Sequence, residues 1–260
     1  MPRKPRIISS TGIYHIILRS VNQQIIFEED SDFQKFLFIL SDCKSKYDVD
    51  IFAYCLMSNH IHLLLRSDSD TLSHFFLSLG TRFARWYNDK YTRYGHLFQE
   101  RYHSKPVEDE AYFITSFLYI HNNPVKAGFC LSASEYRWSS YNAFFGEENA
   151  IINLSFPYNV FGDAENLQRL LSANKVSNTD TKDLDEFDSI SSDHRLTNEK
   201  AIEKFKDISS LNNPFEIVNL PRNTRNQLLQ KLRQNGLSIN QIARITGISS
   251  STVKRVNREA

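Results

Sequence analysis

Residues 51–66 have the sequence IFAYCLMSNHIHLLLR, two apolar stretches separated only by Ser58 and Asn59. Continuous apolar runs of this length are typical of strands that are buried on both faces. The short polar break predicts a tight connection between two neighbouring strands. We therefore expect one strand over residues 51–57 and the next over residues 60–66, and the rest of the fold can be placed around this pair.

The flanking segments predict further strands and helices around this pair. β-Branched and aromatic residues predict a strand over residues 13–19, and a last, irregular strand is expected over residues 101–107. Apolar residues at helical spacing predict three helices, over residues 30–46, 71–89 and 109–123. The order β-α-β-β-α-β-α predicts an α+β fold, with a ferredoxin-like antiparallel sheet and helices on one side.

Charge is sorted along the chain, although the formal net charge is only +1. Residues 221–260 hold eight basic side chains against one acidic one, whereas residues 178–193 hold six acidic side chains against one basic one. The basic end is a candidate for binding nucleic acid. Residues 174–193 are also rich in Ser, Asn, Asp and Thr, which predicts a linker or a loosely ordered segment.

The basic end has the pattern of a helix-turn-helix. A helix is expected over residues 223–234, a short helix follows from Ser238, and residues 246–248 supply a tight turn around a glycine. The final helix, capped by Ser249 or Ser250, would turn its polar side toward a DNA major groove. Its expected DNA-binding residues are Ser251, Thr252, Lys254, Arg255 and Arg258. The alternative is a helical docking domain with a solvated basic face.

Length and composition fit this organisation. We predict a first domain over residues 1–145, a linker or irregular helical segment over residues 146–213, and a helix-turn-helix domain over residues 214–260. No apolar run approaches the roughly 18 residues of a transmembrane helix, and the basic start leads into no signal core. We therefore expect a cytoplasmic protein without a membrane partner. The three cysteines are widely spaced and odd in number, which predicts reduced thiols.

His60 and His62 are candidate metal ligands. Residues two apart on a strand project from the same face, with Cα atoms about 6.5–7 Å apart, so both imidazoles can hold one divalent cation. The motif is weak alone, because 8 histidines in 260 residues give about 0.24 such pairs by chance. A histidine that only packs on a strand remains the alternative.

Tyr119 and Asn123 are the second pair of candidates. They are four residues apart near the end of the third predicted helix, which Pro124 should end, and they therefore share a face. Asn123 can offer its carbonyl oxygen to a cation, while Tyr119 offers an oxygen nucleophile. A free tyrosine has a pKa near 10, so its attack on a phosphodiester needs a cation on the phosphate. Alone, Tyr119 could equally be a packing residue.

These residues resemble a known family when taken together. The stretch from Tyr54 to Leu65 looks like the His-hydrophobic-His motif of single-tyrosine HUH transposases, closest to the branch of REP-associated tyrosine transposases and their relatives. Residues 119–128, YIHNNPVKAG, are similar to the tyrosine-helix signature of that branch. The resemblance covers about residues 8–145, and the tail lies outside it.

The resemblance implies an HUH nuclease fold and a DNA transposase that cleaves and rejoins single-stranded DNA hairpins through a 5′-phosphotyrosine. It further implies Mg²⁺ or Mn²⁺ as cofactor, Tyr119 as the nucleophile, and His60 and His62 as metal ligands. Asn123 would stand where relatives outside this branch carry a glutamine, with a reach one methylene shorter. The sequence leaves open a homodimer, and with it whether Tyr119 acts in its own subunit.

Between the motifs, basic and aromatic residues alternate over residues 82–105. Single-stranded DNA needs cations for its phosphates and flat faces for its bases. Arg93 and Arg101 are our candidates there, although a solvated loop has the same composition.

Two other functions remain open. One is a non-catalytic DNA-binding regulator derived from a transposase, in which the tail alone supplies specificity. The other is a small metallohydrolase, which would have no use for Tyr119.

Overall fold

The structure is a computed structural model, and it describes residues 6–173, 182–190, 198–209, 211, 213–237 and 239–256. The chain divides into two compact units, Met1–Ser191 and Ser192–Ala260. We describe each unit by itself. The domain boundaries expected at residues 145 and 213 stay predictions.

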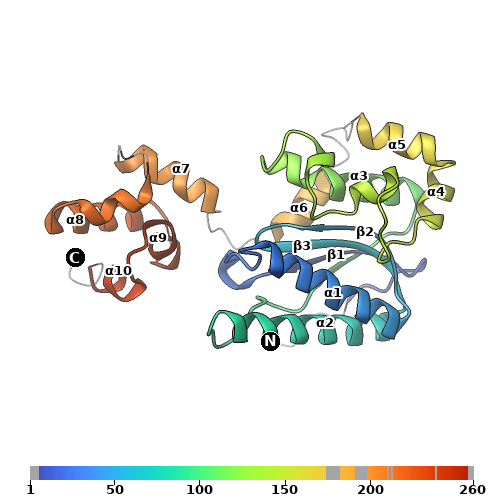
Figure 1. The fold of residues 1–260 in the computed structure, drawn as a ribbon, viewed down its shortest axis with the longest axis horizontal. Helices are drawn as coiled ribbons and strands as arrows, with labels where there is room; N and C mark the ends of the chain where they lie inside the picture. Colours follow the sequence, from blue (N-terminus) through green and yellow to red (C-terminus); the bar gives the residue numbers. More distant parts are fainter. Residues whose placement is uncertain are drawn as a thin grey trace. The chain divides into compact units, whose positions relative to one another are not determined.

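The first unit is built on a four-stranded antiparallel sheet. Its strands lie in the order β2-β3-β1-β4, which is the ferredoxin-like arrangement (Figure 1). Their bounds are β1 Ile13–Arg19, β2 Asp50–Leu56, β3 His60–Arg66 and β4 His103–Pro106. The predicted sheet is thereby confirmed, with β4 shorter than the expected residues 101–107. Because β3 pairs with β2 on one side and β1 on the other, its position is fixed on both sides.

Helices cover both faces of the sheet, whereas we expected them on one side only. The two ferredoxin-like helices, α1 (Asp30–Tyr47) and α2 (Ser69–Lys90), pack on each other and lie on one face. Helix α3 (Glu110–Lys126) packs on β2 and β3 from the other face (Figure 1). The Asp109 carboxylate caps α3 by accepting a hydrogen bond from the Tyr112 backbone N–H at 2.7 Å.

The prediction that Pro124 ends α3 was wrong. Pro124 lies inside the helix, which continues to Lys126. Proline removes only one backbone donor, and the next turn still forms because the Ala127 N–H donates to the Asn123 carbonyl at 2.9 Å. The helix stops immediately afterwards, where Gly128 adopts a φ of 76°.

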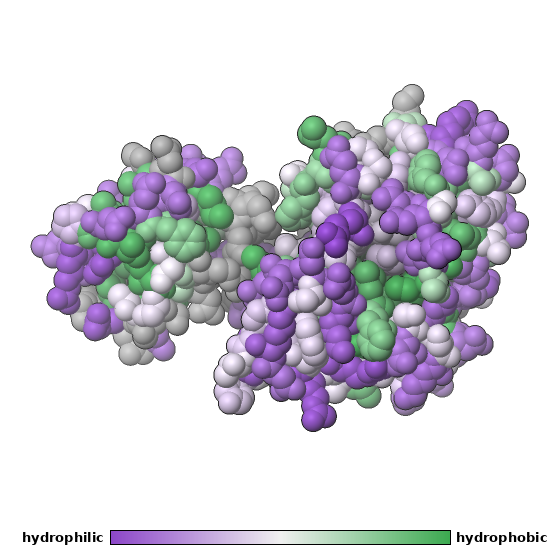
Figure 2. Space-filling model, viewed as in Figure 1, coloured by the Kyte–Doolittle hydropathy of each residue, from purple (hydrophilic) through white to green (hydrophobic). Residues whose placement is uncertain are grey.

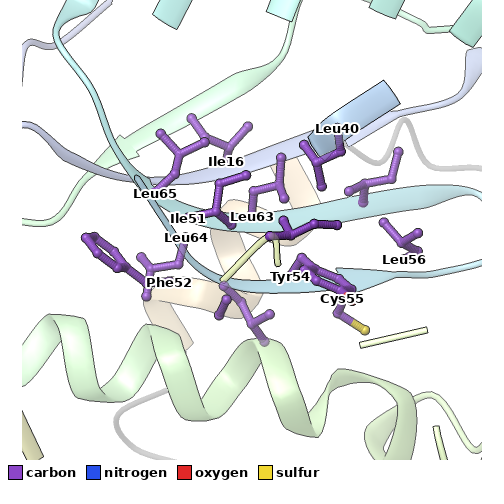
Figure 3. Close-up of a cluster of buried hydrophobic side chains, with 14 of the residues drawn as sticks. Ile16, Leu40, Ile51, Phe52, Tyr54, Cys55, Leu56, Leu63, Leu64 and Leu65 are labelled. Carbon is purple, nitrogen blue, oxygen red and sulfur yellow. The ribbon is translucent and has the colours of Figure 1, made fainter. Parts of the chain in front are cut away.

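The apolar runs of β2 and β3 form the centre of the core (Figure 3). Leu63, Leu64 and Leu65 are fully buried, as expected for a strand covered on both faces. Phe52 faces α3, where its ring centroid lies 5.7 Å from that of Phe113. Both faces of β3 are therefore apolar over residues 63–65, and the polar side chains His60 and His62 follow Leu64 on one of these faces toward the start of the strand.

Further helices follow the sheet in the first unit. They are α4 Ser155–Phe161, α5 Ala164–Ser172 and α6 Lys182–Ile190, and the short 3-10 helices of this unit are Val21–Gln23, Ala133–Glu135 and Tyr141–Phe145. Helix α6 lies within the segment that we expected to be a loosely ordered linker. For residues 182–190 that expectation was wrong, because they form a helix against the sheet; residues 174–181 and 191–193 lie outside the described residues.

The second unit is a small bundle with a core of its own. Its elements are α7 Asn198–Ser209, the 3-10 helix Pro214–Asn219, α8 Arg222–Gln234, α9 Ile239–Thr246 and α10 Ser250–Val256. Gly247 makes the predicted turn at a φ of 71°. The Ser249 hydroxyl then caps α10 by accepting from the Thr252 N–H at 3.3 Å. The predicted helix-turn-helix is confirmed, while Ser238 lies outside the described residues.

Among the described residues, no helix is both long and apolar enough to span a membrane. Hydrophilic side chains cover most of the face shown in Figure 2, with smaller hydrophobic patches between them. Cys43, Cys55 and Cys130 are free thiols.

Candidate active site

His60 and His62 project from the same face of β3, as the strand period predicts. Their ring centroids lie 4.9 Å apart and nearly perpendicular. His62 is fully buried, whereas His60 is partly exposed at the end of the strand. The inner position of β3 holds both rings in place, because β1 pairs with it from His60 to Arg66 and β2 pairs with it from Ile61 to Arg66, with one irregularity in β2.

The Nδ1 atom of each imidazole is engaged by a neighbour. His62 Nδ1 lies 3.1 Å from His15 Nε2 on β1, and His60 Nδ1 lies 2.7 Å from Asn59 Oδ1. An Nδ1 proton that is donated to such a partner leaves Nε2 unprotonated. The buried His60 Nε2 has no hydrogen-bond partner. Both rings therefore direct an electron pair at Nε2 into the space beneath α3.

Burial keeps these histidines neutral. It lowers the pKa of His60 and His62 well below 6.5, with a further lowering from the positive charge of Arg19. Burial also lowers the pKa of His15 to about 3. Neutral imidazole is the form that binds a metal ion, so the three rings are in that form at neutral pH.

Helix α3 brings the second predicted pair to the same place. Asn123 is buried, and its Nδ2 lies 3.3 Å from His62 Nε2. The Tyr119 ring centroid lies 6.0 Å from that of His62. A rotation of the Asn123 amide would turn its carbonyl oxygen toward the same nitrogen, which is the orientation that a metal ligand needs. The structure thus brings together all four residues that the sequence singled out for chemistry.

The hydroxyl of Tyr119 is held in an anionic setting. It donates to Asp188 Oδ2 at 3.1 Å. Burial, followed by the negative charge of Asp185, raises the pKa of Tyr119 above its usual value near 10. In this arrangement the hydroxyl stays protonated at neutral pH.

Asp188 and Arg19 complete the site, and sequence reasoning missed both. Asp188 Oδ1 forms an ion pair with Arg19 and lies 4.0 Å from His62 Nε2. Burial lowers the pKa of Arg19 to about 10, so its guanidinium remains charged at neutral pH. The acidic run in residues 178–193 was the available signal, but local sequence does not show which surface an acidic helix contacts.

The donors fit a divalent cation. Ligand atoms of His60, His62 and Asp188 lie within 4.8 Å of one another. The unpartnered His60 Nε2 also indicates a metal site, because a buried acceptor without a partner lowers the stability of the fold unless a ligand binds it. Two imidazoles with an oxygen ligand suit Mn²⁺ and related first-row ions.

The remaining predicted DNA-binding residues lie elsewhere. Arg93 is near Asn88 and the Tyr87 ring, and Arg101 is exposed before β4. Among the described residues, no hydrogen bond or ion pair joins either arginine to His60 or His62. In the second unit Lys254 and Arg255 are exposed on α10, and Thr252 is partly exposed. Arg258 and the side chain of Ser251 lie outside what the structure describes.

Each of the two units contains a segment that matches a known protein family. Residues 9–123 match the family model described as IS200-like transposases, and residues 221–259 match that of the helix-turn-helix domain of resolvases. No protein among the curated sequences matches the chain.

Two solved structures are similar to the chain. One is a REP-associated tyrosine transposase bound to a REP hairpin, at 16% identity and a TM-score of 0.49, covering 59% of this chain and 92% of that one. The other is a transposase candidate from Deinococcus radiodurans R1, at 20% identity and a TM-score of 0.33, covering 42% and 89%.

Proposed function

We propose that this chain, whose residues 9–123 match the family model of IS200-like transposases, cleaves and rejoins single-stranded DNA through a covalent tyrosine intermediate. One observation supports this most directly. The Tyr119 hydroxyl and His62 Nε2 face the same carboxylate, at 3.1 and 4.0 Å from its two oxygens. The proposed nucleophile and a proposed metal-binding nitrogen therefore face the same position, which the negatively charged Asp188 carboxylate occupies.

Tyr119 would attack the phosphorus of one DNA phosphodiester. Its phenolic oxygen forms a bond to phosphorus while the bond to the 3′-oxygen breaks, leaving a free 3′-hydroxyl and a 5′-phosphate on the tyrosine. The phenolic proton leaves during the attack, and the departing 3′-oxygen takes up a proton. Attack by a 3′-hydroxyl on the phosphotyrosine reverses these events and joins the strands without an energy source.

His60, His62 and an oxygen ligand, which we assign to Asn123, would hold Mg²⁺ or Mn²⁺. A bound ion would supply Lewis-acid neutralisation of the scissile phosphate. His15 and Asn59 fix the two imidazoles through their Nδ1 atoms, so that the ligands need little reorganisation. Arg19 adds a positive charge next to Tyr119, and it lowers the pKa of the hydroxyl, opposing the effects of burial and Asp185.

The helix-turn-helix tail would contribute affinity for the element to be processed. Its exposed cations on α10 suit the phosphates and base edges of a duplex, such as the stem of a hairpin. Arg93 and Arg101 stay proposed contacts for the single-stranded part. Chemistry and target choice would then belong to different units of the chain.

A selection experiment tests this function. The full chain is incubated with Mn²⁺ and a library of single-stranded DNA hairpins, and the DNA that remains attached after denaturation is sequenced. We expect hairpins linked through a 5′-phosphate to Tyr119, located by mass spectrometry of the digested protein. The Tyr119→Phe protein is the matched control, since it keeps the ring and loses the hydroxyl. An equal yield of adduct with that variant would refute the assignment.

A further inference from the structure

Helix α6 places three carboxylates on three cations, of which Arg19 and Lys126 lie next to Tyr119. Asp188 pairs with Arg19 of β1, Asp183 with Lys105 of β4, and Asp185 with Lys126 of α3. The cations come from three separate elements, and each has one of these carboxylates as its ion-pair partner. The helix lies on the same side of the sheet as α3 (Figure 1).

The Asp188 carboxylate has the surroundings that a scissile phosphate would need. One oxygen accepts a hydrogen bond from the Tyr119 hydroxyl, and the other lies between Arg19 and His62 Nε2. A reacting group must approach its nucleophile to about 3–3.5 Å, and the Asp188 oxygen is 3.1 Å from Tyr119. A carboxylate also takes the same charge-assisted hydrogen bonds as a phosphate.

Lys126 and Lys105 add two further positive charges, each next to an aromatic ring. Lys126 Nζ lies 5.4 Å from the centroid of the Tyr119 ring, and Lys105 Nζ lies 5.1 Å from that of Tyr112. Each lysine thus stands at an aromatic face. A groove that holds single-stranded nucleic acid combines cations for the backbone with aromatic faces for bases.

A polyanion such as DNA can displace the carboxylates of α6 from the cations that they contact. The helix has nine residues; Leu184 is fully buried, the Phe187 ring packs against that of His15, Asp183 is exposed and Asp185 is partly exposed. Exposed ion pairs contribute little stability, and salt screens them. A DNA strand offers a row of phosphates and releases counterions when it binds.

We propose that Arg19, Lys105 and Lys126 form the binding track for the phosphates of the substrate strand, with the carboxylates of α6 occupying that track in the free protein. This inference rests on the proposed function, because it takes single-stranded DNA as the substrate. It adds three substrate-binding residues beyond Arg93 and Arg101. It also requires α6 to leave before DNA reaches Tyr119.

A different role for Asp188 makes the opposite prediction. If Asp188 were a permanent metal ligand with His60 and His62, its neutralisation would weaken metal binding and lower cleavage. If it stands where a phosphate will lie, its neutralisation should strengthen DNA binding. The sign of the effect therefore separates the two roles.

The test measures binding apart from chemistry. All proteins carry Tyr119→Phe, no metal is present, and the probe is a fluorescein-labelled strand of 20 thymidines followed by anisotropy. The triple variant Asp183→Asn, Asp185→Asn, Asp188→Asn should bind at least about tenfold more tightly than the parent. The matched control carries Asp42→Asn, Asp70→Asn and Asp89→Asn on α1 and α2, with the same change in net charge, and should gain less than about twofold.

The lysines are tested in the background of the triple variant. Lys105→Gln and Lys126→Gln should each weaken binding and reduce the slope of log K against log salt by about 0.7, the value for one phosphate on a single strand. Arg82→Gln, at an exposed ion pair with Asp42, is the matched control. Thermal unfolding confirms that each variant is folded.

Three results would overturn the inference. The first is equal binding by the triple variant and its charge-matched control. The second is an unchanged salt slope for both lysine variants. The third is a loss of Mn²⁺ affinity of more than about tenfold for Asp188→Asn, measured by calorimetry, which would make Asp188 a ligand. None of these depends on adduct formation, so failure of the proposed chemistry would be seen separately.

Discussion

The candidate active site and the α10 helix differ in how they hold their polar side chains. In the active site His15, His62 and Asn123 are buried and linked to one another beneath α3. On α10 Lys254 and Arg255 stand in solvent over a core of apolar residues. A buried polar network is rigid and sensitive to each member, whereas exposed cations act nearly independently. Substitutions should therefore have large, specific effects in the first region and small, additive effects in the second.

The largest effect is expected at the metal-binding face. His60→Ala removes an Nε2 that we assign to the metal, so adduct formation should fall at least about 1000-fold, which corresponds to about 4 kcal/mol. Binding of duplex DNA through the tail should stay within about twofold. Single-turnover gel assays of the adduct and anisotropy with a duplex measure the two quantities. Arg82→Gln serves as the surface control, and a loss below about tenfold would remove His60 from the ligand set.

The second largest effect is expected at acid pH, which should destabilise the first unit more than the second. Burial lowers the pKa of His121 from 6.5 to about 4, although the hydrogen bond between its ring and the Phe117 carbonyl acts in the opposite direction. The unfolded chain takes up a proton near pH 6.5 that the folded chain resists. The free energy of unfolding of the first unit should thus fall by about 3 kcal/mol between pH 6.5 and 4 from His121 alone, and stay level above pH 6.5.

Tryptophan fluorescence reports this loss selectively, because Trp86 and Trp138, the two tryptophans of the chain, lie in the first unit. Urea titrations in EDTA at several pH values measure it. The second unit contains one histidine, His194, and should show a much smaller change in circular dichroism. A first unit of constant stability from pH 6.5 to 4 would contradict the buried neutral state of His121.

Sequence alone predicted much of this comparison. The strand period placed His60 and His62 on one face, and the helical repeat placed Tyr119 with Asn123. The turn at residues 246–248 predicted the tail. These features depend on neighbours within a few residues, where the geometry of strand and helix is nearly fixed.

Contacts across long separations could not be predicted. Arg19 and Asp188 are 169 residues apart, and nothing in either local sequence indicates that they meet. The polar composition of residues 174–193 favoured a linker, since Leu184, Phe187 and Ile190 are the only apolar residues of α6. Nothing in the sequence around His15 indicates that β1 pairs with β3 and so brings His15 to His62.

That contact gives the third prediction. His15→Phe keeps a ring in the core but removes the acceptor for the Nδ1 proton of His62, so Mn²⁺ affinity should fall about 10- to 100-fold. Isothermal calorimetry with Mn²⁺ measures it directly. His74→Phe, at an exposed position on α2, is the matched control. Unchanged affinity would show that His15 only fills space next to His62.

The tail should respond more weakly. Lys254→Gln together with Arg255→Gln removes two exposed cations from α10, so affinity for duplex DNA should fall about tenfold, and the slope of log K against log salt should decrease by about 1.8. Adduct formation on a saturating hairpin should be unaffected. Anisotropy over a range of NaCl concentrations measures the slope. An unchanged slope would favour the alternative of a helical docking domain with a solvated basic face.

The smallest effect is expected at the cap of α10. Ser249→Ala removes the acceptor of the Thr252 N–H, and a lost cap of this kind costs about 1 kcal/mol. The core beneath α10 should keep the helix folded, since Val253 and Val256 stay buried in it. Thermal unfolding followed by circular dichroism should shift only for the second unit, while tryptophan fluorescence from the first unit stays the same. A matching shift in both signals would mean that the two units unfold together, and the contrast between them would then hold for chemistry but not for stability.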